Sequence, residues 1–100
     1  MIGNYIKRDP DPVQAVLFTG FNFEEIHDFL KRKAVYSWLV KTKFIKQVRF
    51  FDSFTLHKIN VDNYLVFDPK IRSFEVMSEF EFEKKYLYKD TIVEKKDDKL

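Results

Sequence analysis

The chain has 100 residues, no cysteine and a formal net charge of +2. Without cysteine it has no disulfide framework, no thiolate zinc site and no cysteine nucleophile, and a reducing compartment fits. Twelve Phe, five Tyr and one Trp stand against two Gly and three Pro. We therefore expect one domain with a core built from large rings.

The chain shows no apolar stretch of the kind that targets or spans a membrane. Its first residues lack an apolar core before their charges, and no run approaches the roughly 18 apolar residues of a membrane span. We therefore expect a soluble cytoplasmic protein with no membrane partner.

The first third of the chain predicts an arm, a strand and a helix. Residues 1–12 are expected to form an extended arm, because the alternating prolines at 10 and 12 forbid a helix. A short apolar strand follows at 13–18 and stops at Thr19-Gly20. A helix is expected over 23–32, since its apolar residues are spaced to form one stripe.

The remainder predicts strands, a second helix and a tail. From residue 35 the apolar residues follow the period of two that is typical of strands. The expected strands are 35–42, 44–50, 54–59, 64–67 and 71–77. A helix is expected over 79–88. Residues 89–100 are mostly charged, which predicts a flexible tail outside the domain of residues 13–88.

Both expected helices begin with the same pattern of a polar N-cap, a glutamate three residues later and an apolar pair that flanks the cap. At the first helix the cap is Asn22, the glutamate is Glu25 and the apolar pair is Phe21 with Ile26. At the second the cap is Ser78, the glutamate is Glu81 and the pair is Met77 with Phe82.

These elements predict an α+β fold. Consecutive hairpin strands pair antiparallel, and two short helices need a sheet against which to bury their apolar stripes. The expected order is β-α-β-β-β-β-α, with one curved antiparallel sheet packed by the helices. A small half-open barrel is the alternative.

No motif in the chain predicts catalysis, a cofactor or a metal. His27 and His57 have no partner at a metal-ligand spacing. The carboxylates gather at the two helix starts, where they stabilise the positive end of the helix dipole. No Gly-x-Ser-x-Gly elbow or Gly-rich phosphate loop is present. We expect a protein that is not an enzyme.

The middle of the chain is basic, with eight basic residues and one acidic residue between positions 31 and 58. Basic groups interleaved with rings are typical of proteins that bind single-stranded nucleic acid. The alternative is that the rings form the core while the lysines form the wet face of a sheet. The candidate partner-binding residues are Lys31, Arg32, Lys33, Tyr36, Trp38, Lys41, Lys43, Lys46, Arg49 and Phe51.

Four aromatic residues are not assigned to the inside by the strand and helix patterns: Tyr5, Phe51, Tyr86 and Tyr88. Exposed together, they would form a protein-binding patch. The alternative is that they pack against the domain.

Two segments resemble a family of small uncharacterised phage and prophage proteins. The first is Val13-x-Ala15-Val16-x-Phe18-Thr19-Gly20-x-Asn22-x-x-Glu25-Ile26, where the family has V-x-A-x-x-W-T-G and then N-x-x-E-I. The second comprises Asn63-Tyr64-Leu65-Val66 and Phe82-Glu83-Lys84-Lys85-Tyr86, where the family has G-D-Y-I-V and F-E-K-x-Y. The family tryptophan is Phe18 here, and its P-G-D turn is Val61-Asp62-Asn63.

The resemblance covers roughly residues 13–30 and 61–87 and omits the basic middle. It implies a small phage-encoded domain of the bacterial host cytoplasm, and it supplies no active-site residues.

Two functional hypotheses follow. The first is a small phage accessory protein that binds a host or defence macromolecule through a protein surface, with inhibition of that macromolecule as one form of the hypothesis. The second is a nucleic-acid-binding module that uses segment 31–58. Homodimerisation through an exposed strand edge is a further expectation.

Overall fold

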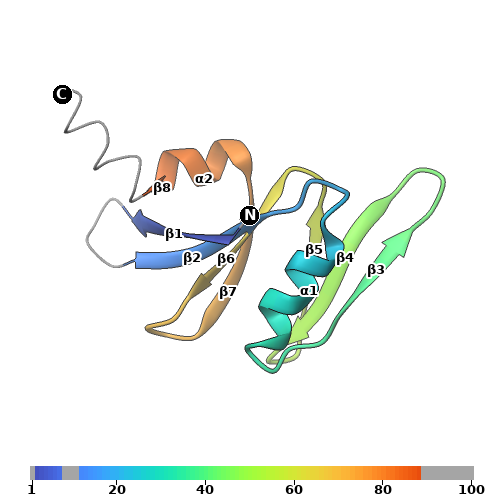
Figure 1. Cartoon of the computed structure of the whole chain (residues 1–100), viewed down its shortest axis with the longest axis horizontal. Coiled ribbons are helices and arrows are strands. Elements are labelled where there is room, and N and C mark those ends of the chain that lie inside the picture. The colour runs from blue at the N-terminus through green and yellow to red at the C-terminus, as the bar shows by residue number, and fades with distance from the viewer. Residues whose placement is uncertain (1, 8–11, 89–100) are drawn as a thin grey trace.

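The computed structural model describes residues 2–7 and 12–88, and in that part of the chain two antiparallel sheets and two helices form one globule (Figure 1). The larger sheet has five strands in the order β7-β6-β2-β1-β8. Their bounds are Ile2–Lys7 for β1, Pro12–Leu17 for β2, Asn63–Asp68 for β6, Ser73–Ser78 for β7 and Tyr86–Tyr88 for β8.

The smaller sheet has the order β3-β4-β5, with bounds Ser37–Lys41, Lys46–Asp52 and Thr55–Asn60. Helix α1 spans Phe23–Lys31 and lies on the inner side of this sheet, while α2 spans Glu79–Lys85 and lies on the larger sheet (Figure 1). The predicted α+β class, the antiparallel hairpins and both helices are confirmed.

The prediction of one curved sheet is wrong. After β5 the chain turns through Val61–Asp62 into β6, which pairs with β2 instead of β5. In β2 and β6, consecutive residues such as Ala15 and Val16, or Leu65 and Val66, are all buried. A strand that is apolar on both sides needs cover on both faces of its sheet. In the larger sheet β2 and β6 are interior strands. Neither sheet closes on itself.

The ends of the domain also differ from the prediction. Residues 2–7 were expected in an arm, but they form β1, which pairs with β2 from Ile2 opposite Val16 to Ile6 opposite Pro12. Residues 86–88 leave α2 and add β8 to β1 as an edge strand. Both pairings join segments far apart in sequence or separated by a proline-rich stretch, so local periodicity gives no sign of them. The predicted tail at 89–100 lies outside the described residues.

Two apolar clusters hold the layers together. The first joins the inner face of the smaller sheet to α1 and the larger sheet, and Phe50 of β4 contacts Phe74 of β7 in it, with ring centroids 5.3 Å apart. Phe74 in turn contacts Phe67 at 4.9 Å. The second cluster lies beneath α2 and includes Phe82, whose ring stacks on Tyr64 at 3.9 Å.

The two predicted capping boxes have different outcomes. At α2 the box is present: Ser78 Oγ accepts from the Glu81 backbone N–H, and the Glu81 carboxylate accepts from the Ser78 N–H. Met77 and Phe82 are buried in the same cluster, so the predicted apolar pair is confirmed.

At α1 the prediction of a capping box is wrong. The Asn22 side chain makes no cap hydrogen bond; its Nδ2 donates to the Leu17 carbonyl at 2.7 Å, and its Oδ1 accepts from the Thr19 N–H at 2.8 Å. Phe21 is 91 % exposed and cannot pack on Ile26. The tight turn at Gly20, with φ of +94°, brings Asn22 back to the end of β2, where those bonds compete with the cap.

Replacing Ser78 with Ala is expected to lower the free energy of unfolding by about 1 kcal/mol, because the first turn of α2 loses its cap. Urea denaturation measures the loss. Ser73→Ala, at a serine with no side-chain hydrogen bond in the described structure, is the matched control, with a change within about 0.5 kcal/mol. Equal losses in both variants would contradict the role of the box.

The adjacent residues Phe50 and Phe51 provide a second test. Phe50 is fully buried and Phe51 is 58 % exposed. We expect Phe50→Ala to lower the free energy of unfolding by about 3–5 kcal/mol, since it opens a cavity between the sheets. Phe51→Ala should cost less than about 1 kcal/mol. Chemical denaturation of the two variants measures the difference, and a reversed order would show that β4 faces the other way.

Candidate binding surface

The register of the smaller sheet separates its residues into two faces. Ser37, Val48, Phe50 and Ile59 point inward and are buried. Because side chains alternate along a strand, the residues between them point to the opposite side. We call this side the outer face; its residues are Trp38, Val40, Gln47, Arg49, Phe51, Leu56, Lys58 and Asn60, and none of them is buried.

Aromatic rings line one side of the outer face. Tyr36, which precedes β3, stacks on Trp38 with centroids 6.4 Å apart and planes 21° apart. Trp38 contacts Phe51 on the neighbouring strand at 5.9 Å. We call these three residues the ring row; Tyr36 is 72 % exposed and Phe51 is 58 % exposed. The outer face thus presents contiguous aromatic surface to solvent.

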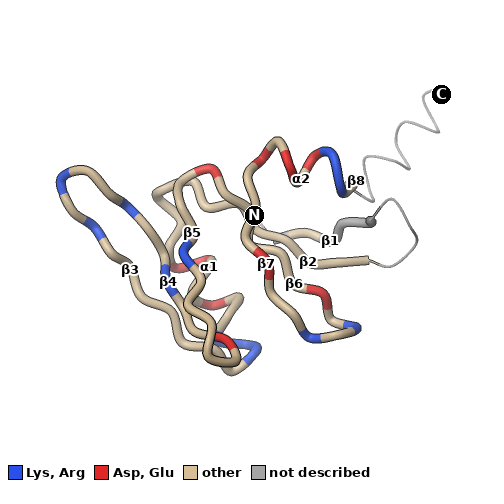
Figure 2. The backbone as a smooth tube through the Cα atoms, turned by 180° about the vertical axis from the view of Figure 1, so that it is seen from behind, with Lys and Arg blue, Asp and Glu red and all other residues tan. Residues whose placement is uncertain are grey.

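The cations of the smaller sheet stand opposite one another. Arg49 pairs with Lys58 across β4 and β5, and Lys41 pairs with Lys46 across β3 and β4. In the part of the chain that the structure describes, no carboxylate forms an ion pair with any of the four. Like charges directly opposite each other destabilise an antiparallel pair, so these two pairings cost the fold stability. Figure 2 shows Lys and Arg positions, in blue, along the β3–β4 hairpin, β4 and β5.

Two amides orient the guanidinium of Arg49. Its Nε donates to Gln47 Oε1 at 2.8 Å, and Gln47 Nε2 donates to Asn60 Oδ1, also at 2.8 Å. The chain of bonds runs across the outer face from β4 to β5. It holds the Arg49 side chain on the sheet and leaves the terminal N–H groups of the guanidinium without a partner among the described residues.

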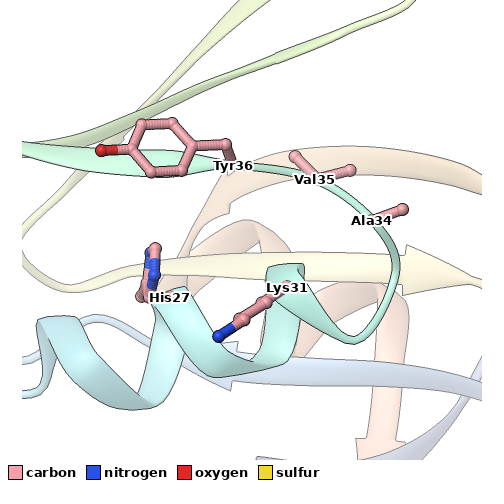
Figure 3. A pocket seen from close by; sticks show the side chains of 5 residues that line it. All are labelled: His27, Lys31, Ala34, Val35 and Tyr36. Atoms are coloured by element: carbon pink, nitrogen blue, oxygen red, sulfur yellow. The ribbon is translucent and has the colours of Figure 1, made fainter.

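A pocket of about 330 Å³ lies at the Tyr36 end of the ring row. Figure 3 shows His27 and Lys31 on α1 facing the segment that carries Val35 and Tyr36. The rings of His27 and Tyr36 meet edge to face at 5.7 Å. His27 Nδ1 is 3.0 Å from Ser37 Oγ.

The turn between β4 and β5 is strained and aromatic. Asp52 pairs with Thr55, so the loop has two residues, Ser53 and Phe54, with φ of +48° and +70°. Such turns favour Asn-Gly, because positive φ is costly for other residues, above all a bulky one. Phe54 is fully exposed. Conformational strain at a hairpin tip that presents a ring to solvent is a feature of functional surfaces.

The structure divides the predicted partner-binding residues into three groups. Tyr36, Trp38, Arg49 and Phe51 lie together on or beside the outer face, with Lys31 at the pocket that ends the ring row.

The second group lies at the hairpin between β3 and β4. Lys46 Nζ lies 4.4 Å from the Phe21 ring, Lys43 Nζ lies 5.8 Å from the Phe44 ring, and Lys41 lines a shallow pocket with Lys46. The third group is Arg32 and Lys33 at the end of α1.

Lys33 lies over the Phe29 ring, with Nζ 4.0 Å from the centroid. Burial lowers the pKa of Lys33, and the nearby charges of Arg32 and Arg72 lower it further. This cation belongs to the packing at the end of α1 and is not part of the outer face.

The predicted patch of Tyr5, Phe51, Tyr86 and Tyr88 is wrong in its described members. Tyr86 is 4 % exposed and packs on Phe82, whereas Phe51 lies on the outer face. The side chains of Tyr5 and Tyr88 lie outside the described residues.

Five residues of the outer face were absent from the predicted partner-binding set: Val40, Gln47, Leu56, Lys58 and Asn60. Alternation from the buried Ile59 could have assigned Lys58 and Asn60 to one side. It gives no indication of which face is covered.

Comparison with models of protein families, with curated proteins and with solved structures found no match to this chain. Among the described residues, no group of three His, Asp or Glu side chains is arranged to hold a metal ion. No helix in that part of the chain has the length and apolar character needed to cross a membrane.

The strain of the β4–β5 turn predicts that Ser53→Asn with Phe54→Gly raises the free energy of unfolding by about 1–3 kcal/mol, because Asn-Gly adopts positive φ readily. Thermal and urea denaturation measure the gain. Phe54→Ala removes the ring but keeps a residue that disfavours positive φ, so its stability should change by less than about 0.5 kcal/mol. An equal gain in Phe54→Ala would assign the cost to the exposed ring.

Proposed function

We propose that this protein is a non-catalytic binding domain that binds a host or defence macromolecule through the outer face of β3, β4 and β5. The observation that carries the proposal is the exposed ring row beside the opposed cations Arg49 and Lys58. Exposed aromatic surface with an arginine is the composition of binding hot spots.

Several features of this face cost stability. Tyr36 and Phe51 remain largely exposed, two cations stand opposite each other, and the adjoining turn is held at positive φ. Local choices that conflict with the global fold are expected at functional sites. A partner that covers the rings and neutralises the cations would remove the first two of these costs on binding.

The contacts of the two histidines support a non-catalytic role. His27 is paired with Ser37, whose side chain is 1 % exposed, so a substrate has no access to that hydroxyl. His57 stacks on the buried Phe50 ring with centroids 4.6 Å apart. Both histidines take part in packing, and neither has a carboxylate partner among the described residues.

The phage origin, the bacterial cytoplasm and the role against a host or defence component rest on the sequence resemblance. They are part of the proposal. A second copy of the chain is a further candidate partner, because β3 and β5 are both edges of the smaller sheet.

Affinity capture from a bacterial lysate tests the proposal. We expect the wild-type chain and the control Phe44→Ala with Phe80→Ala to retain the same material. Both control residues are exposed and lie outside the outer face. Trp38→Ala with Phe51→Ala should retain at least tenfold less, since it removes two rings of the row.

The bound material is then treated separately with nuclease and with protease to identify its class, and sedimentation of the pure protein measures self-association. Equal retention by the outer-face variant and the control would refute this face as the binding surface. Release of a second copy of the chain alone would assign the face to homodimerisation.

A further inference from the structure

Resting on the proposed function of the outer face, we propose that its partner is single-stranded nucleic acid, with bases stacked on the ring row and phosphates bound by Arg49 and Lys58. The occupant follows from the charge of the face and from the rung in which one ring stands beside two cations.

Both charged residues of the outer face are positive. Of its eight residues, two are cations, two are amides and none is acidic. Lys31 lines the pocket at the Tyr36 end of the row and adds a third cation there. An anionic polymer complements such a surface.

The register of β3, β4 and β5 places a ring beside two cations. Trp38 of β3 stands opposite Arg49 of β4, which stands opposite Lys58 of β5. Neighbouring strands lie about 4.8 Å apart, so the backbones at the two ends of this rung are roughly 10 Å apart. A nucleotide likewise has a flat base at one end and a phosphate at the other. A base on Trp38 therefore directs its phosphate toward Arg49 and Lys58.

The rings favour a single strand over a duplex. Stacking on an aromatic side chain needs the face of an unpaired base, which a duplex does not offer. Binding through stacking and phosphates tolerates any sequence, so weak sequence preference is expected.

The arrangement is ordered before binding. Arg49 is held by Gln47 and Asn60 through two bonds of 2.8 Å, and Trp38 is held between Tyr36 and Phe51. Side chains already fixed in place lose little conformational entropy when a ligand arrives.

Trp38 is the single tryptophan of the chain, so its fluorescence reports on the ring row. We expect an oligonucleotide of about ten uridines or thymidines to quench it in a saturable titration, and the affinity to fall as salt rises. A duplex of equal length should bind at least tenfold more weakly. Phe51→Ala should weaken single-strand binding roughly 5- to 150-fold, the effect of one lost stacking contact.

A charge variant tests the phosphate contacts. Arg49→Gln with Lys58→Gln should reduce the slope of log affinity against log salt by about 1.4, since each neutralised phosphate contributes about 0.7. The matched control, Lys70→Gln with Lys84→Gln, removes the same charge away from the outer face and should leave the slope within about 0.3 of wild type. Circular dichroism and thermal melts check that each variant is folded.

Several outcomes would overturn the inference. They are the absence of quenching at low salt, equal affinity for duplex, or an equal loss of slope in the control variant. If oligonucleotides fail to bind while lysate capture still depends on Trp38 and Phe51 and resists nuclease, the partner is a protein. In that case the outer face remains the binding surface, and only the nucleic-acid assignment is rejected.

Discussion

The contact between the two sheets is the constraint on which the rest of this structure depends. Phe50 of β4 packs on Phe74 of β7, and Phe74 packs on Phe67 of β6, so one run of rings joins the smaller sheet to the larger. Residues Val48 and Ile59 are buried with Phe50. Since side chains alternate along strands, burying these three residues directs their neighbours to the outer face.

The packing of the core therefore decides which residues form the outer face, but none of those residues is buried in the core. Trp38, Arg49, Phe51 and Lys58 occupy the positions that the buried residues leave, and a domain selected for stability alone would fill them with uncharged or oppositely charged pairs. Opposed cations, exposed rings and a turn at positive φ instead lie within one small sheet. The combination of stacked rings with opposed cations on one sheet face motivates both proposals.

The two helix starts show how far a sequence pattern can be extended to structure. Asn22 and Ser78 have the same polar cap and the same glutamate three residues later, yet only Ser78 forms the capping box. Ser78 leaves β7 in an extended conformation with its hydroxyl directed at the new helix. Asn22 follows a turn at Gly20, and its amide bonds to Leu17 and Thr19 instead. Because a carboxamide can donate as well as accept, the Asn22 side chain bonds to a backbone carbonyl and a backbone N–H at the end of β2.

The sequence by itself determined the α+β class, both helices, the hairpins and the absence of known catalytic motifs, because periodicity, caps and turn residues act over a few positions. Only the tertiary structure decided that the strands form two sheets, that residues 2–7 pair with β2, and which side of β3–β5 is open. Alternation assigns residues to two sides of a strand, but which side is covered depends on segments far away in the chain. The rings of residues 36–54 were therefore recognisable as a group, while their division between Phe50 in the core and Trp38 and Phe51 outside required the packing of Phe50 on Phe74.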